Sequence, residues 1–301
     1  MNLLKTTRQL CNLYGIKPAR SRGQNFLIEE EVYEKILKAA DLKEGDIVLE
    51  VGPGLGFLTT RLAKIVKKVV AVELDDKLAE ILRTGLIAQR VYPVKSGDAG
   101  ILPSAKLFDR VKNVEVVNED ILKTPLAFLI KGEYKIVANL PYNITSIFLR
   151  KFLSVENKPE MMVLMLQKEV AERIVAEPPK MSLLAISVQF YARAEIIEIV
   201  PANCFWPKPE VDSAIIKLIV EAHNYASSRG RASVRDEEKF FRLVKIGFSA
   251  KRKMLKNNLA AGFHITPEEA EKRVKRAGFN LKIRAQELSV EDWVKLLGEF
   301  I

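Results

Sequence analysis

The sequence predicts an α/β fold with a seven-stranded sheet, followed by a small all-helical domain. From Ile47 onward, short apolar runs alternate with helical patterns. This alternation is typical of βαβ units, in which helices cover both faces of a parallel sheet and ligands bind beyond the carboxyl ends of the strands. Beyond about residue 240 the patterns are only helical. Since 301 residues exceed the usual size of one compact domain, we expect two domains.

Seven apolar runs predict the strands, because each is short and rich in the residue types of buried strands. They lie at residues 47–51, 69–74, 114–117, 135–138, 161–166, 195–200 and 213–220. An amphipathic helix is expected at 29–42, where Val32, Ile36, Leu37 and Ala40 share one face. Further helices are expected at 58–66, 168–176 and 182–190.

A change in composition between Val220 and Phe240 marks the expected linker, because this stretch is rich in Ser, Arg and Gly. We therefore expect a Rossmann-like domain at 1–222 and a helical, basic domain at 236–301. Helices of the second domain are predicted at 240–248, 251–259, 267–278 and 289–300. Thr266 before Pro267 predicts an N-cap with proline at the first helical position.

The composition, 48% hydrophobic and 29% charged, is that of an ordinary soluble globular protein. The N-terminus has no continuous apolar segment, and nowhere do about 18 uncharged apolar residues run together, so we expect a cytoplasmic protein without a membrane span. Cys11 and Cys204 are too far apart in sequence to suggest a disulfide framework or a cysteine zinc site. His223 and His264 lack the spacing of metal ligands, so no metal is expected.

The net charge of +10 favours nucleic acid as a partner, because a cationic surface attracts polyanions and releases their counterions on binding. The charge is uneven along the chain. Residues 221–301 hold 17 Lys and Arg against 11 Asp and Glu. The C-terminal domain is therefore the expected RNA-binding part, although a Lys-rich surface that only keeps the protein soluble is an alternative.

The segment EVGPGLG, residues 50–56, lies between a predicted strand and a predicted helix. Gly52, Gly54 and Gly56 allow the backbone to turn sharply and approach a ligand that a side chain would block. Glu73 ends the next strand, 21 residues after Gly52, where a carboxylate can accept hydrogen bonds from both ribose hydroxyls of an adenosyl group. This spacing also fits nicotinamide dinucleotides, and a purely structural turn is a further alternative.

Asp120 ends the third predicted strand, in VEVVNEDIL. In this topology its carboxylate can accept a hydrogen bond from the adenine amine of the cofactor. Asp98, in SGDAG, is a competing candidate. It precedes the strand and lies in a stretch containing Pro and Gly, so Asp120 is favoured.

The tetrapeptide Asn139-Leu140-Pro141-Tyr142 follows the fourth strand and favours methyl transfer over hydride transfer. The lone pair of an adenine amine is delocalised into the ring, so hydrogen-bond acceptors must favour a pyramidal nitrogen that faces a sulfonium methyl. The side-chain carbonyl of Asn139 and the backbone carbonyl of Leu140 can each accept one amine hydrogen, while Pro141 restricts the backbone. Tyr142 can stack on the flipped base. A structural turn is the alternative.

Seven segments occur in an order that resembles a known family. They are GQNFL (23–27), EVGPGLG, AVELD (71–75), NLPYNITS (139–146), MLQKEVAERI (165–174), FWPKPEVDSA (205–214) and RKMLKNNL (252–259). Together they resemble the motifs of the ribosomal RNA adenine dimethyltransferases, from about residue 5 to the C-terminus. The implied fold is the class I S-adenosylmethionine-dependent methyltransferase, with a Rossmann-like seven-stranded sheet. Leu140 favours the small-subunit enzymes over the related large-subunit resistance methyltransferases, where Ile is usual.

The resemblance implies S-adenosyl-L-methionine as the cofactor, bound by Asn25, Leu27, Gly52, Gly54, Gly56, Glu73, Asp120 and Asn139. Phe205 matches the aromatic residue that would stack on the target adenine opposite Tyr142, with a core phenylalanine as the alternative. The implied reaction adds two methyl groups to each of two adjacent adenosines near the 3′ end of small-subunit ribosomal RNA. The expected partner is that RNA in a pre-ribosomal particle, and we expect the protein to be a monomer. The connection at 85–112 is longer than is usual in the family.

A basic cluster in the C-terminal domain is the expected RNA-binding surface. It comprises Lys239, Arg242, Lys245, Lys251, Arg252, Lys253 and Lys256, with no acidic residue between them. Such a cluster can follow a phosphate backbone, where it sets affinity and register but not base identity. A solvated basic face without a partner is the alternative reading of the cluster.

Two other functions fit the same motifs. One is a large-subunit adenine methyltransferase, and the other is a non-catalytic ribosome-assembly or transcription factor. The intact tetrapeptide at 139–142 favours an enzyme over the non-catalytic factor.

Overall fold

The computed structural model describes residues 2–18, 24–84, 112–220 and 234–300. By the contacts among its residues, the chain divides into two compact units, which we call the sheet unit (Met1–Lys168 with Glu195–Ile219) and the helical unit (Glu169–Ala194 with Val220–Ile301). Residues 169–194 thus group with the C-terminal helices, and the domain bounds of 1–222 and 236–301 stay a prediction. Most of the long connection at 85–112, with Asp98, and most of the expected linker lie outside the described residues.

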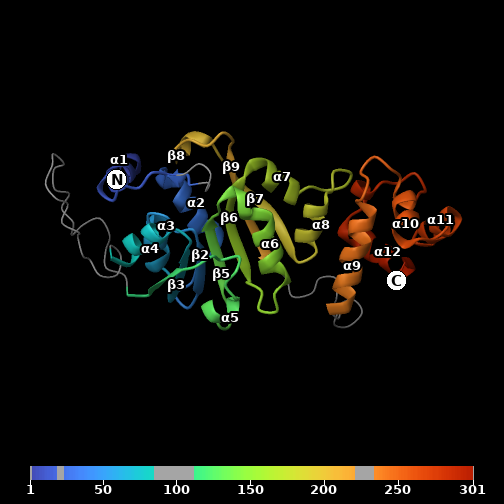
Figure 1. The fold of residues 1–301 in the computed structure, drawn as a ribbon, viewed down its shortest axis with the longest axis horizontal. Helices are drawn as coiled ribbons and strands as arrows, with labels where there is room; N and C mark the ends of the chain where they lie inside the picture. Colours follow the sequence, from blue (N-terminus) through green and yellow to red (C-terminus); the bar gives the residue numbers. More distant parts are fainter. Residues whose placement is uncertain (1, 19–23, 85–111, 221–233, 301) are drawn as a thin grey trace. The chain divides into compact units, whose positions relative to one another are not determined.

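The sheet unit is built on a seven-stranded sheet with the strand order β4-β3-β2-β5-β6-β9-β7 (Figure 1). The strands are β2 (Ile47–Val51), β3 (Lys68–Glu73), β4 (Val114–Asn118), β5 (Lys135–Asn139), β6 (Met161–Gln167), β7 (Ala192–Val200) and β9 (Ser213–Val220). All seven predicted strands are therefore confirmed. The strand order reverses between β2 and β5, and in open α/β sheets ligands bind at such a switch point, beyond the carboxyl ends of the strands.

The sheet is mixed rather than parallel throughout. Strands β2 to β6 pair in parallel, whereas β9 is antiparallel to β6. The chain runs from β7 to β9 through residues 201–212, which contain no α-helix. Parallel neighbours need a long crossover connection, usually a helix, and this segment does not contain one.

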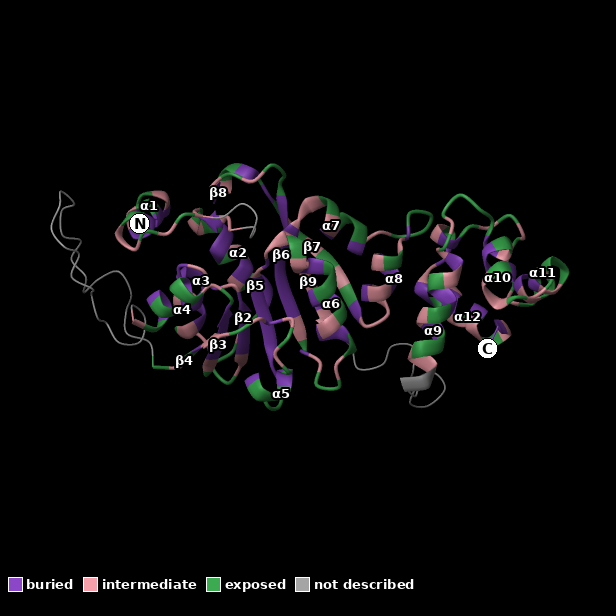
Figure 2. Cartoon of the chain, in the orientation of Figure 1, coloured by how far each residue is buried: buried purple, intermediate pink, exposed green. Residues whose placement is uncertain are grey.

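Helices cover both faces of the central strands. Val48 and Leu49 of β2 point to opposite faces, and both residues are fully buried. Figure 2 shows that the central strands are mostly buried along their length. The described helices of this unit are α1 (Leu3–Leu13), α2 (Glu30–Ala40), α3 (Phe57–Ala63), α4 (Asp76–Leu82), α5 (Leu126–Leu129) and α6 (Thr145–Ser154). The predicted helices α2 and α3 are confirmed, while α1, α4, α5 and α6 were not foreseen.

A second, two-stranded sheet joins two motifs that are far apart in the sequence. Strand β1 (Phe26–Leu27) pairs antiparallel with β8 (Phe205–Trp206), which follows the short 3-10 helix η5 (Ala202–Cys204). Leu27 lies opposite Phe205. The pairing therefore fixes the N-terminal motif against the FWPKP segment.

The helical unit contains α7 (Lys168–Ile174), α8 (Leu183–Gln189), α9 (Val234–Gly247), α10 (Leu255–Phe263), α11 (Pro267–Arg276) and α12 (Val290–Phe300). Its core includes Phe240, Leu243 and Trp293, all fully buried. Thr266 caps α11 by accepting a hydrogen bond from the backbone N–H of Glu269 at 3.2 Å, with Pro267 at the first helical position as predicted. Among the described residues, no helix is long and apolar enough to span a bilayer.

Candidate active site

A pocket in the sheet unit lies at the carboxyl ends of β2, β3 and β5, where most of the predicted cofactor and catalytic residues meet. Its walls come from five parts of the unit. These are residues 24–27, the helix positions Tyr33 and Ile36 of α2, the glycine turn with the start of α3, the end of β3 with the start of α4, and residues 139–142. The described wall therefore comes entirely from one unit.

The glycine turn needs its glycines. Gly52, Gly54 and Gly56 have φ angles of 67°, 58° and 82°, in the left-handed region that side chains disfavour. A Cβ atom at Gly54 would stand 3.2 Å from the Phe26 ring, so this wall has little space. Gly56 is the N-cap of α3 and does not itself line the pocket.

Glu73 lies in the pocket wall with its carboxylate fixed by two backbone amides. Its Oε2 accepts a hydrogen bond from Gly54 N at 3.1 Å, and its Oε1 accepts one from Asp75 N at 2.9 Å. The residue is 6% exposed, and burial raises the pKa of its carboxyl, an effect that the two hydrogen bonds oppose. Because a carboxylate oxygen can accept more than one hydrogen bond, both oxygens remain able to bind a ligand hydroxyl.

Glu50 is a pocket residue that the sequence reasoning missed. It is 1% exposed, and its Oε2 has no hydrogen-bond partner within the described part of the chain. Burial raises the pKa of its carboxyl to about 8, and the nearby charge of Glu73 adds to the shift. A buried carboxyl oxygen without a partner is costly, so this position suits a ligand that brings a cation or a donor. The signal in the sequence was an acid at the start of the glycine motif.

We expect Glu50→Gln to be more stable than the parent protein at about pH 9, and of similar stability near pH 4. The folded protein keeps the Glu50 proton up to about pH 8, whereas the unfolded chain releases it near the ordinary value of 4.5. Between these values the unfolded state binds fewer protons, so the free energy of unfolding falls as the pH rises. Because glutamine does not titrate, the Glu50→Gln variant does not lose this part of its free energy of unfolding as the pH rises.

Thermal unfolding of both proteins across this pH range measures the effect. Glu80→Gln, at an exposed position of α4, is the matched control and should follow the parent. Parallel curves for Glu50→Gln and the parent would contradict the prediction.

The segment 139–142 lines the pocket beside the glycine turn. Asn139 Nδ2 donates a hydrogen bond to the backbone oxygen of Asn25 at 3.4 Å, which leaves Asn139 Oδ1 as an acceptor. Leu140 N donates to the backbone oxygen of Met165 at 3.3 Å, so its peptide is anchored to β6. The Tyr142 hydroxyl shares a hydrogen bond of 2.7 Å with Ser213 Oγ.

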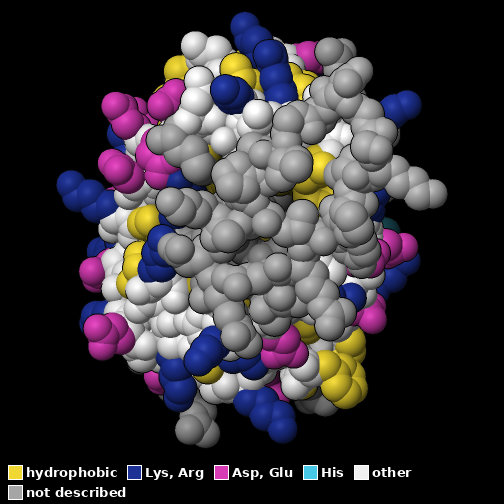
Figure 3. Space-filling model, turned by 90° about the vertical axis from the view of Figure 1, so that its left-hand side faces the viewer, with side chains coloured by type: hydrophobic (Ala, Val, Ile, Leu, Met, Phe, Trp, Pro, Cys, Tyr) yellow, Lys and Arg dark blue, Asp and Glu magenta, His cyan; other side chains and the backbone are white. Residues whose placement is uncertain are grey.

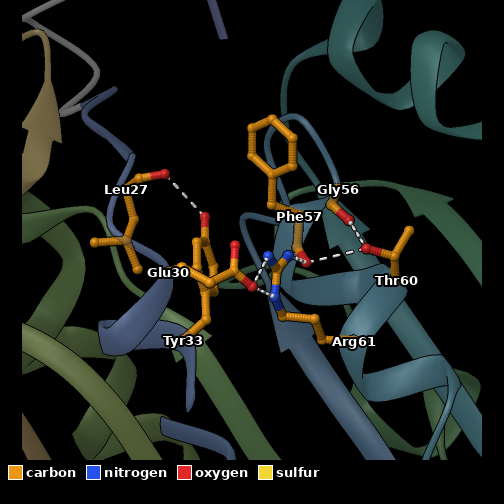
Figure 4. Close-up of polar contacts among 7 residues, drawn as sticks. All are labelled: Leu27, Glu30, Tyr33, Gly56, Phe57, Thr60 and Arg61. Atoms are coloured by element: carbon orange, nitrogen blue, oxygen red, sulfur yellow. Dashed lines mark hydrogen bonds and ion pairs between the residues drawn. The ribbon is translucent and has the colours of Figure 1, made fainter. Parts of the chain in front are cut away.

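Contacts of Arg61 connect two walls of the pocket (Figure 4). The Arg61 guanidinium carbon lies 4.4 Å from the centre of the Tyr33 ring, and Arg61 forms an ion pair with Glu30. Arg61 Nη1 donates to the backbone oxygen of Phe57 at 2.6 Å, and the Tyr33 hydroxyl donates to that of Leu27 at 3.0 Å. These contacts therefore link α2, α3 and the N-terminal motif. The sequence analysis did not predict roles for the side chains of Glu30, Tyr33 and Arg61.

Besides Gly56, two of the predicted cofactor and catalytic residues do not line the pocket. Asp120 follows β4, and its Oδ1 accepts a hydrogen bond from Leu122 N at 2.9 Å. Its neighbour Glu119 donates its backbone N–H to the backbone oxygen of Glu73, which ends β3. Phe205 is 3% exposed and belongs to the hydrophobic core, where it pairs with Leu27. Their roles stay predictions.

The predicted basic cluster lies in the helical unit. Lys239, Arg242 and Lys245 are exposed at intervals of three on α9, and Lys251, Arg252 and Lys253 are exposed between α9 and α10. Lys256 differs, because it is partly buried and forms an ion pair with Glu271. On the side of the sheet unit drawn in Figure 3, by contrast, basic and acidic side chains are interspersed among the described residues.

Comparison with known proteins adds to this geometry. A model of the family described as ribosomal RNA adenine dimethylase matches residues 16–96 and 101–301. The chain is 41% identical over 297 residues to the ribosomal RNA small subunit methyltransferase A of Dehalococcoides mccartyi, covering 98% of this chain and 92% of that protein.

Two crystal structures are also similar. A dimethyladenosine transferase from Plasmodium falciparum gives a TM-score of 0.69 at 26% identity, covering 90% of this chain and 96% of that one. The 23S rRNA methyltransferase ErmE gives a TM-score of 0.68 at 25% identity, covering 92% of this chain and 99% of that one.

Proposed function

The chain belongs to the ribosomal RNA adenine dimethylase family, and we propose that it dimethylates the N6 amines of two adjacent adenosines near the 3′ end of small-subunit ribosomal RNA. S-adenosyl-L-methionine is the methyl donor. The choice of the small subunit is supported by the relative that is 41% identical, whose name specifies that subunit. An enzyme with this activity is an rRNA (adenine-N6,N6-)-dimethyltransferase.

The observation that carries the proposal is a single pocket that is lined both by expected cofactor residues and by the residues expected to act on the target adenine. The glycine turn with Glu50 and Glu73 lines this pocket, and Asn139 with Tyr142 lines it beside that turn. The chain's residues fit the cofactor. The buried Oε2 of Glu50, which has no hydrogen-bond partner among the described residues, suits the ammonium of its methionine part, and Glu73 suits the ribose hydroxyls. Bound there, the cofactor supplies an electrophilic methyl group on a sulfonium.

The protein's own residues act on the target amine. Asn139 Oδ1 and the carbonyl oxygen of Leu140 each accept one amine hydrogen, which favours a pyramidal nitrogen with its lone pair free for the methyl group. Because Asn139 Nδ2 is already bonded to Asn25, the amide is held with its oxygen available. The Tyr142 ring provides a face on which the flipped adenine stacks.

Mass spectrometry of ribosomal RNA tests the proposal directly. Assembled small subunits incubated with the protein and S-adenosyl-L-methionine should gain dimethyladenosine, and large subunits or naked 23S RNA should not. The similarity to ErmE makes the large-subunit reaction the second candidate. Methylation of 23S RNA alone would favour that candidate, and no transfer to either RNA would favour a non-catalytic assembly factor.

We further propose that the enzyme acts as a cytoplasmic monomer on a pre-ribosomal particle. The exposed basic cluster of the helical unit would contact the RNA backbone of the particle.

Reversing Lys251, Arg252 and Lys253 to glutamate should weaken RNA binding and flatten its dependence on salt. Each lost phosphate contact lowers the slope of log affinity against log salt by roughly 0.7 to 0.9, so the slope should fall by about 2 to 3. Filter binding over a salt series measures it. The matched control reverses Lys38, Lys67 and Lys131, which are exposed on the sheet unit. Equal slopes for the cluster variant and the parent would show that the three residues do not contact phosphates.

A further inference from the structure

Tyr142 is held at its tip by a residue from a distant strand. Its hydroxyl lies 2.7 Å from Ser213 Oγ, and Ser213 is fully buried at 0% exposure. Tyr142 begins the 3-10 helix η4 (Tyr142–Ile144) just after β5, whereas Ser213 begins β9. Since β6 lies between β5 and β9 in the sheet, the tyrosine side chain crosses the end of β6 to reach its partner.

The Ser213 end of this contact is rigid. Ser213 is paired with Gln167 of β6. Asp212, which precedes Ser213, makes two hydrogen bonds. The backbone oxygen of Asp212 accepts from Lys168 N at 3.0 Å, and its Oδ1 accepts from Ala202 N at 2.9 Å. The serine hydroxyl is therefore presented from a fixed backbone. The Tyr142 end, by contrast, lies on a three-residue helix that lines the pocket.

We propose that Ser213 is a positioning residue for Tyr142, whose ring it holds in the place where the target adenine must stack. This inference rests on the proposed function. A hydrogen bond at the tip of a tyrosine fixes where the ring lies, because the phenol oxygen cannot move with the first side-chain torsion without breaking the bond. The bond is available throughout the physiological range, since burial raises the pKa of Tyr142 and keeps the phenol protonated.

The position of the ring matters for the reaction. The adenine stacks against the ring, so the place of the ring sets where the amine stands relative to Asn139. Reaction requires the nitrogen and the methyl carbon in line at close range, and small misplacements lower the rate steeply. Loss of the Ser213 hydroxyl should therefore slow methyl transfer while leaving cofactor binding unchanged.

The test compares Ser213→Ala, Tyr142→Phe and the double variant, with Ser154→Ala as the matched control. Ser154 is an exposed serine of α6 whose hydroxyl bonds within its own helix. Single-turnover transfer to assembled small subunits, at saturating cofactor and RNA, should fall by roughly 10-fold in each single variant, because each removes the bond that positions the ring. The double variant should be no slower than the slower single one, since both changes remove the same bond.

Three results would overturn the positioning role while the parent protein remains active. They are a Ser213→Ala rate within about twofold of the parent, a double variant whose loss is the product of the two single losses, and an equal fall in cofactor affinity. If Ser213→Ala does not fold, Tyr142→Phe removes the same bond from the pocket side, and an unchanged rate there overturns the inference. A parent protein that transfers no methyl group would instead contradict the proposed function.

Discussion

Replacing Glu73 by alanine is expected to weaken S-adenosyl-L-methionine binding by roughly 10- to 150-fold, since charge-assisted hydrogen bonds contribute about 1.5 to 3 kcal/mol. The carboxylate would lose its contacts with the ribose hydroxyls. It would also lose the bonds it accepts from Gly54 and Asp75, which hold the glycine turn against the end of β3. Both losses weaken binding of the cofactor.

Titration calorimetry with the purified protein measures the effect. Glu80→Ala, at an exposed position of α4, is the matched control and should bind the cofactor as the parent does. Glu73→Gln keeps one acceptor and the side-chain size, so its affinity should lie between those of the parent and Glu73→Ala. Unchanged affinity in a folded Glu73→Ala variant would remove Glu73 from the cofactor site.

The strands could be predicted because central strands are buried on both faces, which makes them nearly continuous apolar runs such as MMVLML at 161–166. Their direction could not be predicted in the same way. An apolar run does not show in which direction a strand runs, so the antiparallel pairing of β9 with β6 is seen only in the structure. The pair β1 and β8 was missed because a two-residue strand shows no periodicity, and only the folded chain brings Leu27 opposite Phe205.

The centre of the pocket could be predicted because its residues follow neighbouring strands. The carboxyl ends of β2, β3 and β5 meet at one edge, so Gly52, Glu73 and Asn139 had to converge once the strand order was known. The supporting contacts could not be predicted. Ser213 and Lys256 each have a partner that nothing in the sequence indicates, namely Tyr142 across the sheet and Glu271 on the next helix.

Replacing Asn139 by alanine is expected to slow methyl transfer by roughly 100- to 1000-fold, as is typical when one preorganised polar group is removed from an active site. Asn139 Oδ1 acts on the amine as the nitrogen becomes pyramidal, so its loss raises the barrier more than it weakens binding of the substrate. The fold should persist, because the hydrogen bond of the Asn139 side chain within the described part of the chain is a long one, 3.4 Å to the backbone oxygen of Asn25. RNA affinity should persist as well, since the basic cluster belongs to the helical unit.

Single-turnover rates for the Asn139→Ala variant, measured with labelled cofactor and assembled small subunits, give the loss directly. Filter binding of RNA and calorimetry with the cofactor show whether the loss lies in the chemical step. Asn12→Ala, at an exposed position of α1, is the matched control and should retain the parent rate. An Asn139→Ala protein that methylates within about threefold of the parent would defeat the proposed mechanism, because the acceptor on the amine would then be dispensable. An equal loss of RNA affinity and rate would instead assign Asn139 to substrate binding.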